Sequence, residues 1–366
     1  MAPGNESASS VRIEVTSARH KYSVIVGAGV LQQARSLMEA ASLSLPATVV
    51  SSAPIWTAQG DRVSSLTAGD PVLMADGERA KTLRSLSGLY DAFAGRGIDR
   101  AATIIGFGGG VVGDVAGFAA ASYLRGLTYV QIPTTLLAQV DSAIGGKVGV
   151  NLPTGKNLVG AFHPPALVIA DPTVLGTLKR REFRAGLYEV VKYGVIASRP
   201  LFERVATQVR KLLSRNAETL APVITECCRI KADIVSADEF EAGPRRVLNF
   251  GHTIGHALEA VTSYRRFRHG EAIGYGMLAA AHISRARGLM PQGDADAVSE
   301  LVHRLGPLPG VADLTVADVI DATTHDKKRV AGTLHFVLSA GIGQTQIVKD
   351  VTRAELEPAL RAIGLS

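Results

Sequence analysis

The sequence predicts an α/β protein, in which a domain with a mostly parallel β-sheet is followed by a mainly α-helical domain. In the first half of the chain, short β-branched runs alternate with helical patterns, which is typical of a parallel sheet covered by helices. From about Thr177 onward, long amphipathic patterns follow one another instead. The length of 366 residues also suits two domains, at roughly 150 residues each.

Seven segments of the first half have the composition of β-strands. Each is rich in β-branched residues and is bounded by Gly, Pro or Ser, which favour turns. The expected strands are Val11–Val15, Tyr22–Val26, Ala47–Ser51, Pro71–Ala75, Ala101–Gly106, Leu127–Ile132 and Ala166–Ala170. Helices are expected at Ala28–Ala41, at Glu78–Ala94 and after the glycine-rich turn that follows Ala101–Gly106.

The second half is expected to be helical up to a short β-hairpin near its end. The predicted helices are Arg181–Ala197, Pro200–Arg215, Leu220–Ala237, Gly251–Val261, Glu271–Arg287 and Ala295–Leu305, and the predicted hairpin pairs Thr333–Ser339 with Gln344–Val348. Near Asp171-Pro172-Thr173, alternating strand and helix patterns give way to successive amphipathic helix patterns. We therefore expect a flexible tail over 1–10, an α/β domain over 11–175 and a helical domain over 176–366.

Composition limits the possible partners and compartments. The 39 basic and 33 acidic residues give a net charge of +6, which suits an anionic small molecule and also permits a nucleic acid. However, the basic residues lie in short scattered runs, which favours the small molecule. Two adjacent cysteines, a polar N-terminus and the lack of a long apolar run predict a cytoplasmic protein without a membrane segment.

A glycine-rich turn follows the strand at Ala101–Gly106. Gly108, Gly110 and Gly113 fit the pattern G-x-G-x-x-G between a strand and a helix, where a helix N-terminus can bind a pyrophosphate. No acidic residue ends the next strand, so this differs from the ordinary dinucleotide fingerprint. A tight turn with close helix packing is the alternative interpretation.

Two lysines lie in glycine-containing segments further along. Lys147 follows Gly145-Gly146, and Lys156 lies between Gly155 and Asn157. Lysine binds phosphate as a point charge, so these segments predict a cationic loop that binds phosphate. Solvated surface lysines are the alternative.

Histidine spacing in the second half indicates a metal site. His252 and His256 are four residues apart and would share one face of a helix. His269 opens the next helix, and Glu189 lies mid-helix, three residues before Lys192. Two His and one carboxylate leave an open position on zinc for a substrate, with a third His close by. Core or surface histidines are the alternative, and His282, His303, His325 and His335 are interpreted in that way.

Taken together, these segments resemble the sugar phosphate cyclases, and most closely the 3-dehydroquinate synthase branch. The resemblance extends from about Arg12 to Val348. It rests on Gly108–Asp114, Arg125-Gly126, Pro133–Ser142, Gly145–Lys147, Gly155–Asn157, Glu189–Lys192, Asp238-Glu239, Arg245, Leu248–Thr253, His269–Glu271 and Asp326–Lys328. The family implies a Rossmann-like N-terminal domain with bound NAD, a helical domain that binds metal and substrate, a divalent metal (zinc or cobalt) and a homodimer.

The resemblance also implies roles for individual residues. Metal would be held by Glu189, His252 and His269. NAD would be held by Glu78, Lys81, Gly109, Gly110, Asp114, Thr134, Thr135, Lys147, Lys156 and Thr177. Substrate would be bound by Lys147, Asn157, Arg245, Asn249, Lys327 or Lys328, and by Arg125 of a partner subunit, while Asp141, Lys192, Lys231 and His256 would be catalytic. One position departs from the family, since Ser51-Ser52-Ala53 follows the third strand where an acid or Asn commonly contacts the adenosine ribose.

The resemblance implies a phosphate-eliminating carbon–oxygen lyase of the shikimate pathway, which makes precursors of aromatic amino acids. Its substrate would be 3-deoxy-D-arabino-heptulosonate 7-phosphate. The product, 3-dehydroquinate, would arise by transient oxidation with NAD, β-elimination of phosphate, reduction, ring opening and an intramolecular aldol reaction. The alternatives are a cyclase of the valiolone or inosose type, a metal-dependent polyol dehydrogenase of the same fold and, from another class, a nucleic-acid-binding module.

Overall fold

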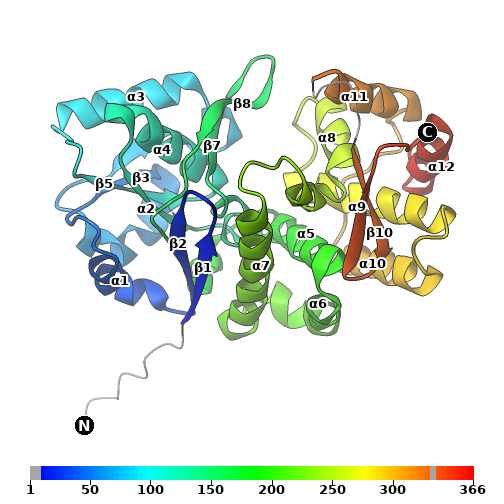
Figure 1. Ribbon diagram of the computed structural model, residues 1–366, viewed down its shortest axis with the longest axis horizontal. Helices are drawn as coiled ribbons and strands as arrows, with labels where there is room; N and C mark the ends of the chain where they lie inside the picture. Colours follow the sequence, from blue (N-terminus) through cyan, green and yellow to red (C-terminus); the bar gives the residue numbers. More distant parts are fainter. Residues whose placement is uncertain (1–9, 330–334) are drawn as a thin grey trace, which may run out of the picture. The chain divides into compact units, whose positions relative to one another are not determined.

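The computed structural model describes residues 10–329 and 335–366, without the side chains of residues 324–329. The chain forms two compact units. Unit 1 contains the chain up to Lys179 together with Ala217–Phe240, and unit 2 contains Arg180–Asn216 and Glu241–Ser366. The expected boundary near residue 175 therefore differs from this division, because one helix of the second half, α7 (Ala217–Ala237), packs against the sheet strands β1 and β2 of unit 1 (Figure 1).

Unit 1 is built on a seven-stranded sheet that contains all seven predicted strands. The strand order is β1-β2-β9-β6-β5-β3-β4. The strands are β1 (Val11–Thr16), β2 (Lys21–Val26), β3 (Thr48–Ser52), β4 (Val72–Met74), β5 (Thr103–Gly108), β6 (Thr128–Pro133) and β9 (Leu167–Ala170). Only the β1–β2 pair of this sheet is antiparallel. The prediction of a mostly parallel sheet is confirmed.

Two helices of unit 1, at Ala34–Ala40 and Leu83–Gly95, are shorter than the sequence suggests. The helices of this unit are α1 (Ala34–Ala40), α2 (Ala53–Gln59), α3 (Leu83–Gly95), α4 (Gly110–Ser122) and α7. The expected helix at Glu78–Ala94 is broken, because Thr82 is extended and caps α3 by accepting a hydrogen bond from the Ser85 N–H. The helix α2, which begins at Ala53 directly after β3, was not expected.

A second sheet in unit 1 occupies the segment predicted as a cationic loop. It is an antiparallel hairpin of β7 (Lys147–Leu152) and β8 (Gly155–Phe162). Gly149 faces Gly160 across it, and a Cβ on Gly160 would lie 2.1 Å from the Val148 carbonyl oxygen. The glycines that look like loop residues in the sequence therefore allow two strands to approach closely.

Unit 2 is mainly helical, as predicted. Its helices are α5 (Arg180–Ala197), α6 (Arg199–Leu213), α8 (His252–Val261), α9 (His269–Ala286), α10 (Gln292–Arg304), α11 (Val316–Arg329) and α12 (Arg353–Ala362). The hairpin β10 (Phe336–Gly341) and β11 (Gln344–Val348) is also present, although part of its expected first strand, from Thr333, lies outside the described residues. The helices α11 and α12 were not predicted from the sequence.

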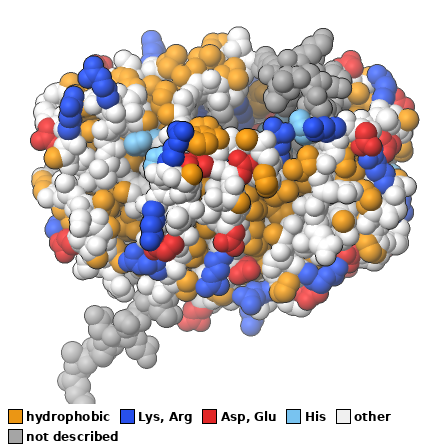
Figure 2. Space-filling model, viewed as in Figure 1, with side chains coloured by type: hydrophobic (Ala, Val, Ile, Leu, Met, Phe, Trp, Pro, Cys, Tyr) orange, Lys and Arg blue, Asp and Glu red, His pale blue; other side chains and the backbone are white. Residues whose placement is uncertain are grey.

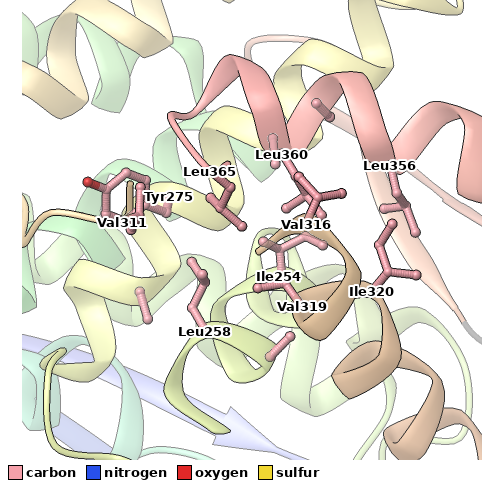
Figure 3. Close-up of a cluster of buried hydrophobic side chains, with 14 of the residues drawn as sticks. Ile254, Leu258, Tyr275, Val311, Val316, Val319, Ile320, Leu356, Leu360 and Leu365 are labelled. Carbon is pink, nitrogen blue, oxygen red and sulfur yellow. The ribbon is translucent and has the colours of Figure 1, made fainter. Parts of the chain in front are cut away.

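The core of unit 2 explains why α8 is held firmly. Ile254 and Leu258 of α8 point toward Val319 of α11 and Leu360 of α12, and all four side chains are buried (Figure 3). Burying side chains of this size stabilises a fold by roughly 1.5–3 kcal/mol each. One face of α8 is thus fixed by apolar packing, and its other face remains for polar side chains.

The described residues show the scattered charges and the lack of a long apolar segment that the composition predicts. On the face shown in Figure 2, Lys and Arg side chains are interspersed with Asp and Glu. Within residues 10–329 and 335–366, none of the helices combines the length and apolar character that a membrane span needs.

Candidate functional site

The helix α8 presents two histidines on the face opposite its apolar contacts. His252 and His256 are one helical turn apart, and they are offset by two residues from the buried Ile254 and Leu258. Two residues correspond to about 200° around a helix, so the two pairs lie on opposite faces. The packing that buries Ile254 therefore turns both imidazoles away from the core.

Glycines bring α8 close to α9, which carries His269. A Cβ on Gly276 of α9 would lie 1.8 Å from the carbonyl oxygen of Gly251, the residue before α8. Gly251 itself has a φ of 78°, which favours glycine. Because Gly251 and Gly276 have no side chains, α8 and α9 can lie close enough for His252 and His256 to meet His269.

The three histidines form one cluster beside a buried carboxylate. The ligand atoms of His252, His256 and His269 lie within 4.8 Å of one another. Glu189 of α5 places Oε1 3.7 Å from His252 Nε2 and 3.4 Å from His269 Nε2. Lys192, one turn further on α5, places its ammonium 2.5 Å from Glu189 Oε2. Sequence reasoning predicted these five side chains for one site, and the structure brings them together.

The charges of this cluster follow from burial and from its carboxylates. Burial, with the nearby Lys192, holds the pKa of His252 well below its usual value. Burial also lowers the pKa of His269, but hydrogen bonds to Glu189 and Glu259 outweigh it and raise this pKa to about 10. Burial thus favours the neutral form of His252, whereas the two carboxylates favour the charged form of His269.

The cluster has the donor chemistry of a divalent metal site. Zinc binds imidazole nitrogen and carboxylate oxygen, and catalytic zinc sites commonly have three protein ligands and one open position. Glu189 and the Nε2 atoms of His252 and His269 supply such a set, while the Lys192 ammonium holds the second oxygen of Glu189. The residues present therefore fit a bound divalent cation.

Further predicted substrate residues lie in unit 2. Arg245 and Asn249 belong to the 3₁₀ segment Pro244–Asn249, where Arg245 is almost fully buried. The Asn249 side-chain amide donates to Glu241 Oε1 at 2.8 Å. Lys327 and Lys328 belong to α11, but their side chains lie outside the described residues.

The glycine-rich turn of unit 1 leads into α4 as predicted. The N-cap residue Gly109 has no side chain that could cap α4, and a Cβ at this position would lie 2.8 Å from Thr135 Cγ2. Thr134 follows β6 beside the turn, and its N–H donates to the Gly108 carbonyl. The N-terminus of α4 has no side-chain cap, and glycine lets a ligand come close to its backbone N–H groups. Such a helix N-terminus suits a pyrophosphate, so this turn fits a dinucleotide.

A polar network lies next to this turn. The buried Lys81 ammonium donates to Asp114 of α4 and to the Asn157 side chain, and Glu78 accepts from the Asn151 side chain at 2.7 Å. Burial raises the pKa of Asp114, although the Lys81 ammonium beside it acts in the opposite direction. A cavity of about 430 Å³ is lined in part by Glu78, Lys81 and Asn151.

The other predicted residues of unit 1 are more dispersed. Lys231 of α7 contacts Asp141, with its ammonium 2.7 Å from Oδ1 and 2.6 Å from the Asp141 carbonyl oxygen. Thr177 accepts a hydrogen bond from the Gln59 side chain at 2.7 Å. Lys147 begins β7, while Lys156 lies in β8.

Arg125 stands apart from these groups on an exposed turn. Its φ is 69°, and it lies between Leu124 with a φ of 49° and Gly126 with a φ of 127°. Three consecutive left-handed residues reverse the chain sharply after α4 and leave the arginine side chain in solvent.

Known protein families match both the N-terminal and the C-terminal part of the chain. The family model described as 3-dehydroquinate synthase N-terminal matches residues 71–185, and the model described as 3-dehydroquinate synthase C-terminal matches residues 186–329. The chain belongs to the 3-dehydroquinate synthase family. A 3-dehydroquinate synthase of Koribacter versatilis is 43% identical over 360 residues, which cover 96% of this chain and 98% of the relative.

Solved structures of other cyclases share the fold of this 3-dehydroquinate synthase family member. The 2-epi-5-epi-valiolone synthase of Streptomyces hygroscopicus, with NAD⁺ and Zn²⁺ bound, has a TM-score of 0.85 at 29% identity, covering 93% of this chain and 96% of its own. A 2-deoxy-scyllo-inosose synthase, complexed with carbaglucose-6-phosphate, NAD⁺ and Co²⁺, has a TM-score of 0.86 at 28% identity, covering 96% and 100%.

Sequence reasoning missed two acidic residues of this family member. Glu259 is buried and contacts His269 Nδ1 at 3.2 Å. It follows His252 by seven residues, so its helical spacing was a usable signal. Asp76 lies in the loop after β4 and accepts from Ser52 Oγ at 3.3 Å. An acidic group is thus present beside Ser52, but it comes from the loop after the neighbouring strand β4, and no local motif around Ser52 could indicate it.

Proposed function

We propose that this protein is a 3-dehydroquinate synthase, which converts 3-deoxy-D-arabino-heptulosonate 7-phosphate to 3-dehydroquinate and inorganic phosphate. The cluster of Glu189, His252 and His269, in a chain about 40–44% identical to curated synthases of this name, carries the proposal. The overall conversion removes one phosphate and involves no net oxidation or reduction.

The chain offers separate groups for a dinucleotide and for a metal. NAD is assigned to the turn at Gly109 and Gly110 with the residues predicted around it, and zinc or cobalt to Glu189, His252 and His269. When bound, NAD supplies a hydride acceptor and donor, and a divalent cation supplies Lewis acidity toward substrate hydroxyl groups.

The remaining residues bind the substrate and orient it. Lys147, Asn157 and His256, with Lys327 or Lys328, are assigned to the phosphate, and His256 accepts or returns a proton there through its imidazole. Arg245 and Asn249 are assigned to the carboxylate. Lys192 is held against Glu189 and Lys231 against Asp141, so each ammonium is fixed before a substrate hydroxyl arrives. Positioning and electrostatics of this kind are the protein's main contribution.

The test is phosphate release from 3-deoxy-D-arabino-heptulosonate 7-phosphate, with absorbance at 340 nm followed in the same cuvette. We expect phosphate release that needs NAD and zinc, stops with chelator and leaves no net NADH. If the metal-loaded protein releases no phosphate from this substrate, the proposal is wrong.

A cyclase of the valiolone or inosose type is the second candidate, because the two solved structures compared above are such enzymes. Phosphate release from another sugar phosphate, together with a different carbocyclic product, would favour it. Steady NADH formation on a polyol would instead indicate a dehydrogenase.

We assign this enzyme to the cytoplasm and to a homodimer. Adjacent cysteines without a disulfide framework suit a reducing compartment. Arg125 is exposed on a turn of unit 1, where it can reach a second copy of the chain. Light scattering on the purified protein tests the dimer, and a monomer mass would contradict it.

A further inference from the structure

Glu259 lies behind His269, on the side of the imidazole that faces away from Glu189. Its Oε2 is 3.2 Å from His269 Nδ1, while Nε2 of the same ring is 3.4 Å from Glu189 Oε1. The two carboxylates therefore contact opposite nitrogens of one imidazole. Glu259 is 3% exposed, so its charge is shielded from solvent.

The two histidines assigned to the metal are anchored differently. His252 Nδ1 is 3.2 Å from the Phe250 carbonyl oxygen, a neutral acceptor, whereas His269 Nδ1 faces an anionic carboxylate. In both rings the anchored nitrogen is Nδ1 and the nitrogen nearest Glu189 is Nε2. A proton held on Nδ1 leaves the Nε2 lone pair for a metal.

We propose that Glu259 is a positioning residue of the metal centre, which fixes the tautomer and ring orientation of His269 and strengthens its Nε2 as a ligand. This inference rests on the metal site of the proposed function but concerns a residue that is not among the proposed metal ligands or substrate-binding residues. A carboxylate in this place makes the imidazole more basic than a carbonyl does, so His269 becomes the stronger of the two histidine ligands.

The structure also explains how Glu259 is kept in place. It is in the second half of α8, seven residues after His252, so it lies on the histidine-bearing face. Its backbone carbonyl accepts from the Tyr264 N–H at 2.7 Å, which closes the turn after α8. The carboxylate is therefore carried by the same helix that Ile254 and Leu258 fix to the core.

The test is the affinity of the purified protein for Zn²⁺ and Co²⁺, measured by competition with a chromophoric chelator in the absence of substrate. Glu259→Leu removes both charge and acceptor at similar volume, and we expect it to weaken metal binding about 10- to 100-fold. Glu259→Gln keeps an acceptor but removes the charge, so it should fall between this variant and the wild type. The visible spectrum of bound Co²⁺ should change in both.

Glu355→Gln is the matched control, because it removes a different carboxylate of unit 2, which is partly buried and pairs with Arg287. It should lower thermal stability and leave metal affinity unchanged. Wild-type affinity and an unchanged Co²⁺ spectrum in Glu259→Gln and Glu259→Leu would overturn the inference, even if both variants melt earlier. If Glu259→Leu does not fold, Glu259→Gln alone decides. A wild-type protein that binds zinc but releases no phosphate would contradict the proposed function and not this inference.

Discussion

The two carboxylate oxygens of Glu189 have different neighbours, and this determines what the residue can bind. The Lys192 ammonium lies against Oε2, while Oε1 faces the Nε2 atoms of His252 and His269. Burying such a carboxylate is costly unless it is paired or binds a metal. A cation in the cluster would complete a set of charges in which each oxygen of Glu189 has a positive neighbour.

Glu189→Gln tests this arrangement at a single residue. The amide keeps the shape but loses the charge, so we expect zinc affinity and metal-dependent turnover to fall by more than about 100-fold, the upper range for second-shell groups. Competition with a chelator and phosphate release measure the two quantities. Glu226→Gln, at a solvent-exposed ion pair with Arg229, should change neither. Full activity in Glu189→Gln would remove this residue from the metal centre.

The sequence predicted the residues of the histidine cluster better than it predicted Asp76, the acidic residue beside Ser52. Histidine spacing and the mid-helix Glu189 carry a local signal, because both depend on helical periodicity alone. Asp76 carries no such signal, since its proximity to Ser52 depends on β3 and β4 being neighbours in the sheet. Long-range strand order is set by packing of the whole sheet and is not encoded around either residue.

At the level of elements, the close contact of α8 with α9 forms the histidine cluster. A Cβ at position 276 would lie 1.8 Å from the Gly251 carbonyl oxygen and 2.7 Å from its carbonyl carbon, and both of these contacted atoms belong to backbone that cannot move aside cheaply. We expect Gly276→Ala to destabilise unit 2 by about 1–3 kcal/mol and to weaken zinc binding, because His252 and His269 would be pushed apart. Thermal melting and chelator competition measure these effects.

Gly293→Ala is the control for this substitution. Gly293 lies in the first turn of α10, where an added Cβ would meet no atom within 4 Å. It should be neutral or stabilising by up to about 1 kcal/mol, with zinc affinity unchanged. If Gly276→Ala behaves in the same way, close packing of α8 and α9 does not form the site.

The start of α12 makes unit 2 sensitive to acid. Hydrogen bonds from Arg287 lower the pKa of Glu355 from 4.5 to about 2, and Glu355 also closes a capping box with Thr352. Because the folded-state pKa is depressed, this stabilisation is complete above pH 4.5 and is lost as the pH falls toward 2. In Glu355→Gln, we expect a loss of about 1–2 kcal/mol at neutral pH.

Urea midpoints of wild type and Glu355→Gln, measured at several pH values, check this expectation. The difference between the two proteins should be constant from pH 7 to about 5 and should shrink between 4.5 and 2. A difference that grows on acidification would contradict the assignment of the effect to the Glu355 carboxylate.

The order of elements was largely predictable, whereas their interruptions were not. All seven strands of the large sheet and the helices α5 to α10 follow hydrophobic periodicity. The hairpin β7–β8 was interpreted as a loop, because its glycines serve close strand approach and not a turn. The place of α7 in unit 1 could not be predicted either, since its amphipathic pattern says that it packs but not against what.

At the scale of the whole molecule, the net charge of +6 suits the proposed substrate. That substrate carries a phosphate and a carboxylate, and a basic protein attracts such a ligand over distances comparable to the Debye length. Basic and acidic side chains are interspersed on the face shown in Figure 2, unlike the continuous basic stripe of many nucleic-acid-binding proteins. On this face, the distribution favours a local site for a small anion over binding of an extended polyanion.

The proposed homodimer gives Arg125 a testable place in the reaction. We expect Arg125→Ala and Glu189→Gln proteins to be nearly inactive alone. If Arg125 reaches the phosphate of the partner's site, a mixed dimer contains one site with an intact Glu189 and an intact Arg125. Random 1:1 exchange makes half of the dimers mixed, so activity should return to about one quarter of the wild-type value.

This complementation distinguishes the two places that Arg125 could occupy. If Arg125 acts within its own chain, every site of the mixed dimer lacks either Arg125 or Glu189, and mixing restores nothing. Exchange of subunits must be verified independently, for example by native mass spectrometry of one isotopically labelled protein. Mixed dimers without recovered activity would assign Arg125 to its own subunit. An exposed arginine on a sharply reversed turn of unit 1 favours recovered activity in the mixed dimers, because its side chain projects into solvent where a second copy can receive it.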